Sequence, residues 1–257
     1  MKTISYEVQD QIGVITIDNP PLNLLSKQVT DELLEAVGDI ENNLPRALLI
    51  RSSGPAFCGG ADVSRFQGMS PQEINSELEG FLSLIQRIEE MPIPTLAAVH
   101  GVCAAGGLEL ALAFDVILAS ESAKFAQSEA IIGAIPFGGG AQRLAERAGA
   151  AKAKEIYYNA GFFSSRNFEQ WGIVNKVVTD DQLESSAFEE ASRLSNGPTR
   201  AYAFTKQIVN SYVENGKTTA DKLTLELGAH IFETGDFRNG VISLLKEGPG
   251  KAVFEGI

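Results

Sequence analysis

Two glycine-rich segments of the chain, residues 52–62 and residues 100–113, have the composition of ligand-binding turns. Each follows a short apolar run that predicts a strand, and the loops after parallel strands are where ligands bind in open sheets. Paired glycines in both segments allow a ligand to approach the backbone closely. The alternative for the first segment is an ordinary connecting loop, and for the second it is close packing of a helix start built from small residues.

The second segment runs from its glycines directly into a predicted helix. The first turn of a helix leaves backbone N–H groups unbonded, and the helix dipole favours negative charge there. If each segment supplies one N–H group to the same oxygen, the two form an oxyanion hole, which suits thioesters because enolate charge develops on the carbonyl oxygen. Neither segment matches the glycine pattern of dinucleotide-binding loops or of P-loops, so those ligands are not indicated.

Two glutamates are candidates for acid–base chemistry beside these turns. Glu109 lies three residues after Gly106, in the first turn of the predicted helix, and Glu129 lies between two apolar stretches. A pair of carboxylates near an oxyanion hole can catalyse proton transfer if burial raises one pKa. The alternative for Glu109 is a surface acid that offsets the helix dipole, and for Glu129 it is a solvated loop carboxylate.

The elements that must hold these residues alternate between strand and helix in the first part of the chain. Such alternation predicts crossover units and a mostly parallel sheet, followed after about residue 180 by a helical tail. Ser26 is typical of a helix N-cap, and Ser70-Pro71 opens a second helix. Apolar runs predict strands at 13–17, 47–50, 95–99, 116–118 and 174–178, and apolar periodicity predicts tail helices at 183–194, 199–212, 223–232 and 237–245.

Composition restricts the function further. The 257 residues fit either one large domain or one domain with a helical appendage. The net charge of −12 argues against nucleic acid or an anionic membrane surface as a partner. An anionic small substrate would need local cations or helix N-termini to offset that charge. We expect a cytoplasmic protein with reduced thiols and without a membrane span, a secretory signal or a disulfide framework, because Cys58 and Cys103 are the only cysteines.

Other reactive side chains offer no competing site. His100 and His230 are the only histidines, so no metal site is expected. The sequence shows neither a base that would activate Cys58 nor a Ser/His/Asp arrangement for nucleophilic catalysis.

Taken together, these segments resemble the crotonase family over nearly the whole chain and in the family's order. As a set, the motifs are specific. They are Asn19-Pro20-Pro21-Leu22-Asn23-Leu24-Leu25-Ser26, Phe57-Cys58-Gly59-Gly60-Ala61-Asp62-Val63, Pro94 to Gly101, Gly106-Gly107-Leu108-Glu109-Leu110-Ala111, Ala123 to Glu129, Gly133 to Leu144, and Trp171 to Val178.

The resemblance implies an α/β fold of the ClpP/crotonase type, a ββα spiral core with a helical C-terminal region. We place the core domain at residues 1–195 and the helical oligomerisation region at residues 196–257. The resemblance also implies assembly into trimers or paired trimers, that is, hexamers.

For the site, the resemblance implies oxyanion N–H donors at Ala61 and Gly106 and a coenzyme A thioester as substrate, with no separate cofactor. In enoyl-CoA hydratases both glutamate positions are occupied, as Glu109 and Glu129 are here. The pair would then hold a water over the double bond, Glu109 taking its proton during attack on C3 and Glu129 protonating C2. Coenzyme A contacts are expected at Gly59, Asp62, Val63, Ser64 and Arg65, with the adenine end near Gly59, Ala61 and Val63.

The sequence departs from the family pattern at several positions. Ala105 replaces the first residue of a Gly-Gly-Gly run, Ser128 stands where the family often has Pro, and Phe137 replaces a small residue. Ser64 stands where some relatives have a lysine near the phosphates, a role open to Arg65 or Lys251. Two other functions therefore remain open: double-bond isomerisation or another crotonase reaction, which would need Glu129 more than Glu109, and a non-catalytic acyl-CoA-binding scaffold.

Overall fold

The computed structural model describes residues 2–256, and its first part repeats a strand–strand–helix unit. The first helix is capped by Ser26, as predicted, and the second begins with a capping box between Ser70 and Glu73. The four units are β1 (Ile4–Gln9), β2 (Ile12–Ile17) and α1 (Lys27–Asn42); β3 (Ala47–Ser52), β4 (Ala56–Cys58), η1 (Val63–Phe66) and α2 (Pro71–Glu90); β5 (Thr95–Val99), β6 (Val102–Ala104) and α3 (Gly106–Leu112); and β7 (Val116–Ser120), β8 (Lys124–Ala126), η2 (Glu129–Ile132) and α4 (Gly140–Ala148).

The chain after the fourth unit is mostly helical. It contributes one more strand to each sheet and then the C-terminal helices. These elements are α5 (Ala150–Asn159), β9 (Phe163–Ser164), α6 (Ser165–Gln170), β10 (Lys176–Val178), η3 (Asp180–Gln182), α7 (Leu183–Ser195), α8 (Thr199–Asn215), α9 (Lys217–Ile231) and α10 (Gly235–Glu247).

The units divide their strands between two sheets. The larger sheet has the order β1-β2-β3-β5-β7-β10, and the smaller has the order β4-β6-β8-β9. From the second unit onward, the first strand of each unit joins the larger sheet and the second strand joins the smaller one. All pairs are parallel except β1 with β2 and β8 with β9, which confirms the mostly parallel sheet and the ββα repeat expected from the sequence.

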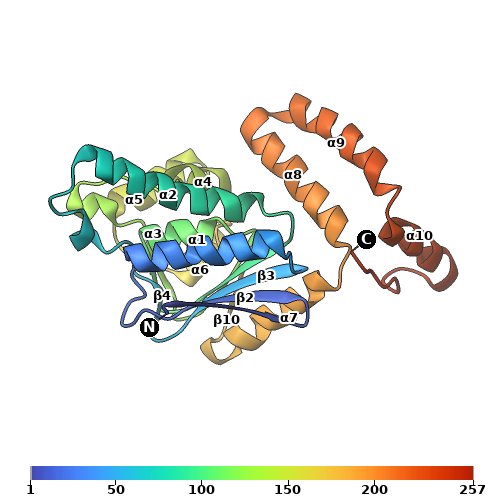
Figure 1. The fold of residues 1–257 in the computed structure, drawn as a ribbon, viewed down its shortest axis with the longest axis horizontal. Coiled ribbons are helices and arrows are strands. Elements are labelled where there is room, and N and C mark those ends of the chain that lie inside the picture. Colours follow the sequence, from blue (N-terminus) through green and yellow to red (C-terminus); the bar gives the residue numbers. More distant parts are fainter. Residues whose placement is uncertain (1, 257) are drawn as a thin grey trace.

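Helices cover the larger sheet on both faces, with α1 and α2 above it and α7 below it in Figure 1. Strand β3 shows how the sheet separates two apolar layers. Leu48 and Ile50 pack into the main core, whereas Leu49 between them packs into a second cluster with Ala187 and Ala191 of α7. Because β3 is buried on both faces, it reads in the sequence as a continuous apolar run.

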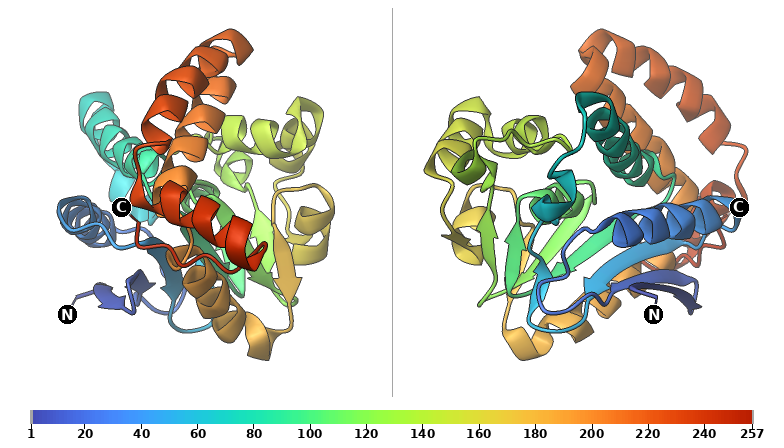
Figure 2. Two further views of the ribbon diagram at one scale, coloured as in Figure 1. Left: turned by 90° about the vertical axis from the view of Figure 1, so that its right-hand side faces the viewer. Right: turned by 60° about the vertical axis from the view of Figure 1, so that its left-hand side comes forward.

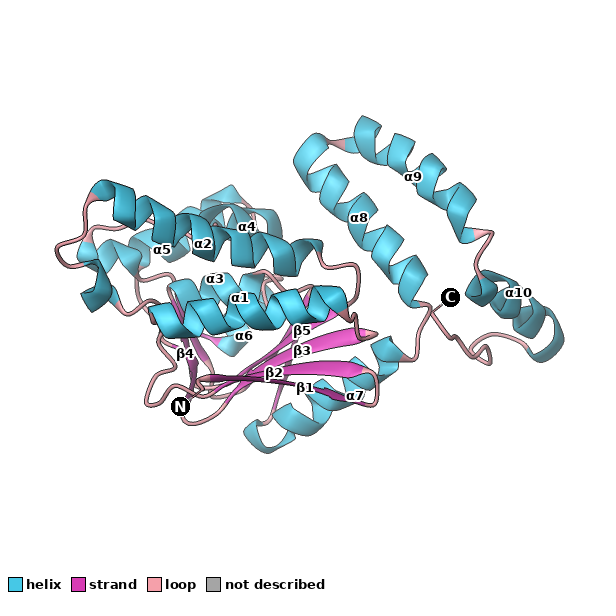
Figure 3. Ribbon diagram, in the orientation of Figure 1, coloured by secondary structure: helices cyan, strands magenta, loops and turns pink. Residues whose placement is uncertain are grey.

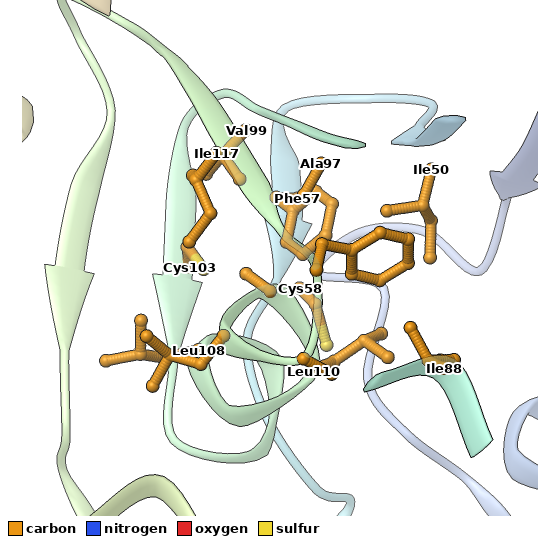
Figure 4. Close-up of a cluster of buried hydrophobic side chains, with 14 of the residues drawn as sticks. Ile50, Phe57, Cys58, Ile88, Ala97, Val99, Cys103, Leu108, Leu110 and Ile117 are labelled. Atoms are coloured by element: carbon orange, nitrogen blue, oxygen red, sulfur yellow. The ribbon is translucent and has the colours of Figure 1, made fainter. Parts of the chain in front are cut away.

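The main core extends to the smaller sheet, beneath the glycine-rich turns. Figure 4 shows Phe57 and Cys58 of β4, Cys103 of β6, and Leu108 and Leu110 of α3 in one cluster, and all five are fully buried. This packing fixes the start of α3 relative to the end of β4.

Helices α8, α9 and α10 lie apart from the sheets (Figures 2 and 3). The chain after α10 folds back on that helix, where Asp236 accepts hydrogen bonds from the N–H groups of Glu255 and Gly256. Arg46, between α1 and β3, donates to the carbonyl of Phe254. Several large apolar side chains of these helices are exposed: Val209, Tyr212, Val213, Leu225, Phe232, Val241, Ile242, Leu244 and Leu245.

Most predicted elements are present, with changes at their ends. The strand predicted at 174–178 is formed only by Lys176–Val178, because the N–H of Val174 bonds instead to Phe168. The helix predicted at 223–232 begins earlier, at Lys217, where a polar first turn carries no apolar pattern. Along the stretch that the structure describes, no helix is both long and apolar enough to cross a bilayer.

Candidate active site

A cavity of about 440 Å³ lies where the two glycine-rich turns meet α2 and the segment after β8. Its wall is mainly apolar, with Phe66 from η1, Phe81 from α2 and Phe137 from the loop before α4. The cavity brings together most of the residues predicted for the site from the sequence. These are Gly59, Ala61, Val63, Arg65, Gly106, Glu109 and Glu129.

The two turns approach each other closely because Gly60 has no side chain. Gly60 has φ +102°, and a Cβ atom there would lie 2.9 Å from the Cβ of Ala105 and 3.0 Å from the carbonyl oxygen of Ala104. The amides beyond it are correspondingly near: the position of a Cβ on Gly106 is 3.6 Å from the backbone nitrogen of Ala61. Ala61 and Gly106 therefore lie close together at one wall of the cavity, and the pairing of their N–H groups on one oxygen stays a prediction.

Helix α3 begins at Gly106, as predicted, after a residue in an unfavourable conformation. Ala105 occupies its N-cap position with φ 49° and ψ −125°, a region that glycine adopts more readily than alanine. Gly107, the second residue of α3, touches β4, because a Cβ atom there would be 2.3 Å from the carbonyl oxygen of Cys58. Burial raises the pKa of the Cys58 thiol to about 12, which makes it a poor nucleophile and fits its packing role.

Glu109 is buried, with 2% of its surface exposed, so the interpretation as a surface acid is wrong. Its Oε1 atom accepts a hydrogen bond from the N–H of Gly140 at 2.8 Å. Burial is the main cause that raises the pKa of Glu109 to about 7, and the charge of Glu129 adds to it, while the Gly140 N–H and Arg143 oppose it. The carboxyl thus holds its proton to a higher pH than an exposed glutamate does.

Glu129 is also largely buried, with 9% of its surface exposed, so the interpretation as a solvated loop carboxylate is wrong. It is the first residue of η2, and its Oε1 atom accepts a hydrogen bond from Nε2 of Gln127 at 2.7 Å. Burial raises the pKa of Glu129 as well. Within residues 2–256, its Oε2 atom has no hydrogen-bond partner, which leaves one acceptor for a ligand at the wall of the cavity.

The residues predicted to contact coenzyme A are not all equally available. Asp62 caps η1 and accepts hydrogen bonds from the N–H and the hydroxyl of Ser64. Arg65 forms an ion pair with Glu77 of α2 and donates to the carbonyl of Leu25, so its guanidinium is already engaged. Phosphate binding by these side chains stays a prediction.

A second hollow, of about 570 Å³, lies beside α7 at the ends of the larger sheet's strands and contains His100, Asp180 and several serines. Nε2 of His100 is 2.8 Å from the carbonyl oxygen of Gly54, and an acceptor there requires that this nitrogen carry a proton. Among residues 2–256, neither ring nitrogen of His100 is hydrogen-bonded to a serine hydroxyl or to a carboxylate, as the histidine of a catalytic triad would be.

Several residues of the site carried no signal in the sequence. Gln127 and Arg143 are polar side chains in apolar surroundings, with 0% and 7% of their surfaces exposed. Gln127 donates a hydrogen bond to Glu129, and Arg143 donates to the carbonyl of Gly138 beside Glu109. Phe81 looks like any other apolar position of α2, although it lines the cavity. Only the buried contacts distinguish these residues from ordinary helix and loop positions.

Comparison with known proteins agrees with this geometry. The model of the enoyl-CoA hydratase/isomerase family matches residues 7–255. The mitochondrial enoyl-CoA hydratase of Pongo abelii is 31% identical over 92% of this chain and 81% of its own, and the 1,2-epoxyphenylacetyl-CoA isomerase of Escherichia coli is 30% identical over 95% and 96%. The crystal structure of an enoyl-CoA hydratase from Bacillus anthracis covers 99% of this chain and 100% of its own, with 25% identity and a TM-score of 0.93. The fold is therefore the crotonase fold, and the chain belongs to the enoyl-CoA hydratase/isomerase family.

Proposed function

We propose that the protein is an enoyl-CoA hydratase, which adds water across the double bond of a 2-enoyl-CoA thioester. The observation that carries this proposal is the pair of buried carboxylates, Glu109 and Glu129, in the cavity where the two glycine-rich turns meet. Hydration needs two proton transfers, one from the water and one to C2, and two carboxylates can divide them.

The reaction would begin with the thioester oxygen between the N–H groups of Ala61 and Gly106. A water held by the two carboxylates attacks C3, and Glu109 takes its proton. The electron pair of the double bond moves toward the thioester, whose oxygen becomes enolate-like and is stabilised by the two N–H groups. Glu129 then delivers a proton to C2, and the water has been added as hydroxyl and hydrogen.

Burial of the two carboxyls supports this division of roles. A carboxyl with a pKa of about 7, as for Glu109, is present in both its ionised and protonated forms near neutral pH. The raised pKa of Glu129 favours the protonated form that a donor requires. In this proposal coenzyme A is part of the substrate, and no further cofactor takes part.

We also propose that the protein assembles into trimers or hexamers in the cytoplasm. The exposed apolar side chains of α8, α9 and α10, such as Tyr212, Leu225 and Leu245, support self-association because a large apolar area is otherwise left in water. Mass determination by light scattering tests this part of the proposal, and a monomer at micromolar concentration would contradict it.

Isomerisation of an enoyl-CoA is the second candidate, favoured by the match to a family model that covers isomerases as well as hydratases. The shift of a double bond from C3=C4 to C2=C3 can be performed by one carboxylate that moves a proton from C2 to C4. This alternative therefore predicts turnover of a 3-enoyl-CoA that depends on Glu129 and hardly on Glu109.

The test follows the loss of the conjugated thioester absorbance of crotonyl-CoA. Hydration should fall by about 100- to 10,000-fold in both Glu109→Gln and Glu129→Gln. Glu155→Gln, at an exposed carboxylate that pairs with Lys152, is the matched control and should leave the rate unchanged. Unchanged hydration in both active-site variants would contradict the proposal, whereas binding of acyl-CoA esters without turnover of any would indicate a scaffold.

A further inference from the structure

The N–H group that contacts Glu109 belongs to Gly140, the first residue of α4, which follows a glycine turn with little rigidity of its own. Gly140 follows Gly138 and Gly139, so three consecutive residues lack a side chain that would restrict the backbone. Gly139 has φ +84°, and as the N-cap residue of α4 it supplies no side-chain hydrogen bond. The hydrogen bond of 2.8 Å from Gly140 to Glu109 therefore needs support from elsewhere.

Arg143, one turn into α4, supplies that support. Its Nη1 atom donates to the carbonyl oxygens of Gly138 at 3.1 Å and Gly139 at 3.4 Å. Only 7% of Arg143 is exposed, so these hydrogen bonds are shielded from water. A guanidinium holding both carbonyls fixes the peptide group between Gly139 and Gly140, which contains the Gly140 N–H, and the peptide group before it.

The guanidinium is anchored in turn by Glu89, near the C-terminal end of α2. Nε of Arg143 donates to Oε1 of Glu89 at 3.1 Å, and Nη2 forms an ion pair with Oε2, which makes the contact bidentate. Figure 1 shows α2 and α4 on the same side of the molecule. The other charges that act on this region are Glu146 and Arg147 of α4.

We propose that Arg143, held by Glu89, is a positioning residue that fixes residues 138–140 so that the Gly140 N–H is aimed at the Glu109 carboxylate. This inference deepens the proposed function and rests on it, because it treats Glu109 as the base. Arg143 does not line the cavity. Its effect on the rate would therefore act through residues 138–140 and Glu109, and not through contact with the substrate. A purely structural role would affect stability and leave the properties of Glu109 unchanged.

Three substitutions separate the contributions of Arg143. Arg143→Gln removes the charge and the fork of donors, Arg143→Lys keeps the charge and loses the fork, and Glu89→Gln leaves the arginine and weakens its anchor. Arg87→Gln is the matched control. Arg87 belongs to α2, as Glu89 does, and forms a comparable bidentate pair with Glu41 of α1, away from residues 138–140. Each variant is checked for folding by circular dichroism and thermal unfolding.

The first readout is steady-state kinetics with crotonyl-CoA. Arg143→Gln is expected to lower kcat by about 100-fold, the typical effect of a small misplacement of a catalytic group, with little change in KM. Arg143→Lys and Glu89→Gln should lower kcat by smaller factors, and Arg87→Gln should not lower it. Wild-type kcat in Arg143→Gln, or an equal loss in Arg87→Gln, would overturn the proposal.

The second readout does not depend on turnover and so separates this inference from the proposed function. The infrared band of the protonated Glu109 carboxyl, identified by its loss in Glu109→Gln, is followed against pH without substrate. The charges that face Glu109 are those of Glu129 and Arg143. Its titration midpoint should rise in Arg143→Gln, rise less in Arg143→Lys, and stay unchanged in Arg87→Gln. An unchanged midpoint in a folded Arg143→Gln protein would refute the positioning role, whatever reaction the enzyme performs.

Discussion

Replacing Glu109 with glutamine is expected to change how the stability of the protein depends on pH. The pKa of Glu109 is raised from 4.5 to about 7 in the folded protein, mainly by burial. A carboxyl with a raised pKa binds its proton more tightly in the folded chain than in the unfolded chain. The folded state therefore loses stability as the pH rises from below 4.5 through about 7.

The size of this loss follows from the pKa difference. The rise of the pKa from 4.5 to about 7 corresponds to about 3 kcal/mol, since a pKa difference of one is about 1.4 kcal/mol. Because only 2% of Glu109 is exposed, solvent screening reduces this figure little. Glutamine has no charge to bury, so the stability of Glu109→Gln relative to the wild type should increase by about 3 kcal/mol between pH 4 and pH 8.

Chemical unfolding of both proteins at several pH values measures this difference. Comparing the two proteins cancels most other titrating groups and any pH-independent change in packing, and Glu155→Gln, at an exposed position, is the control. A stability difference that stays constant between pH 4 and pH 8 would show that Glu109 is not a desolvated carboxyl and would refute the reasoning.

Three further predictions concern the backbone around the site and the C-terminal tail. Ala105→Gly should relieve the strain at φ 49° and raise the melting temperature, since such conformations cost on the order of 1 kcal/mol or more, while activity is retained. Gly107→Ala should lower both stability, by about 1–3 kcal/mol, and activity, because its Cβ would lie 2.3 Å from the carbonyl oxygen of Cys58; a stable, active variant in denaturant titration would contradict this. Asp236→Ala should release the N–H of Glu255 and speed hydrogen exchange in the tail, and unchanged exchange there would show that these hydrogen bonds do not hold it.

The inner strands of the larger sheet were predictable because they are buried on both faces, whereas its edge strand β1, which is mostly exposed, was not predicted. The apolar runs at residues 47–50 and 95–99 correspond to β3 and β5, and Ser26 and Ser70 mark the starts of α1 and α2. The strands of the smaller sheet were not predicted, because β4, β6 and β8 have three residues each and β9 has two. A segment that short shows no period, so tertiary contacts decide its conformation.

The glycine-rich turns and the two glutamates could be selected from the sequence, but their environment could not. Sequence alone left Glu109 and Glu129 as either catalytic or surface carboxylates, since burial depends on what packs over them. For Glu109, the cover includes Gly138 and Gly140, where added Cβ atoms would lie 3.1 Å from its Oε2 and 2.9 Å from its Cγ. The contact depends on a loop about 30 residues away, which no local pattern reveals.

The start of α3 combines two features that oppose folding, and this combination is informative about function. Ala105 is strained, and four residues later Glu109 is a buried carboxyl whose ionisation is unfavourable. Every residue of α3 is nevertheless buried, and the helix packs against Cys58 and its neighbours in the core. The packed core around α3 offsets both costs and keeps the Gly106 N–H and the Glu109 carboxyl in fixed positions. Backbone strain and buried charge that are retained at a cost in stability are typical of functional sites.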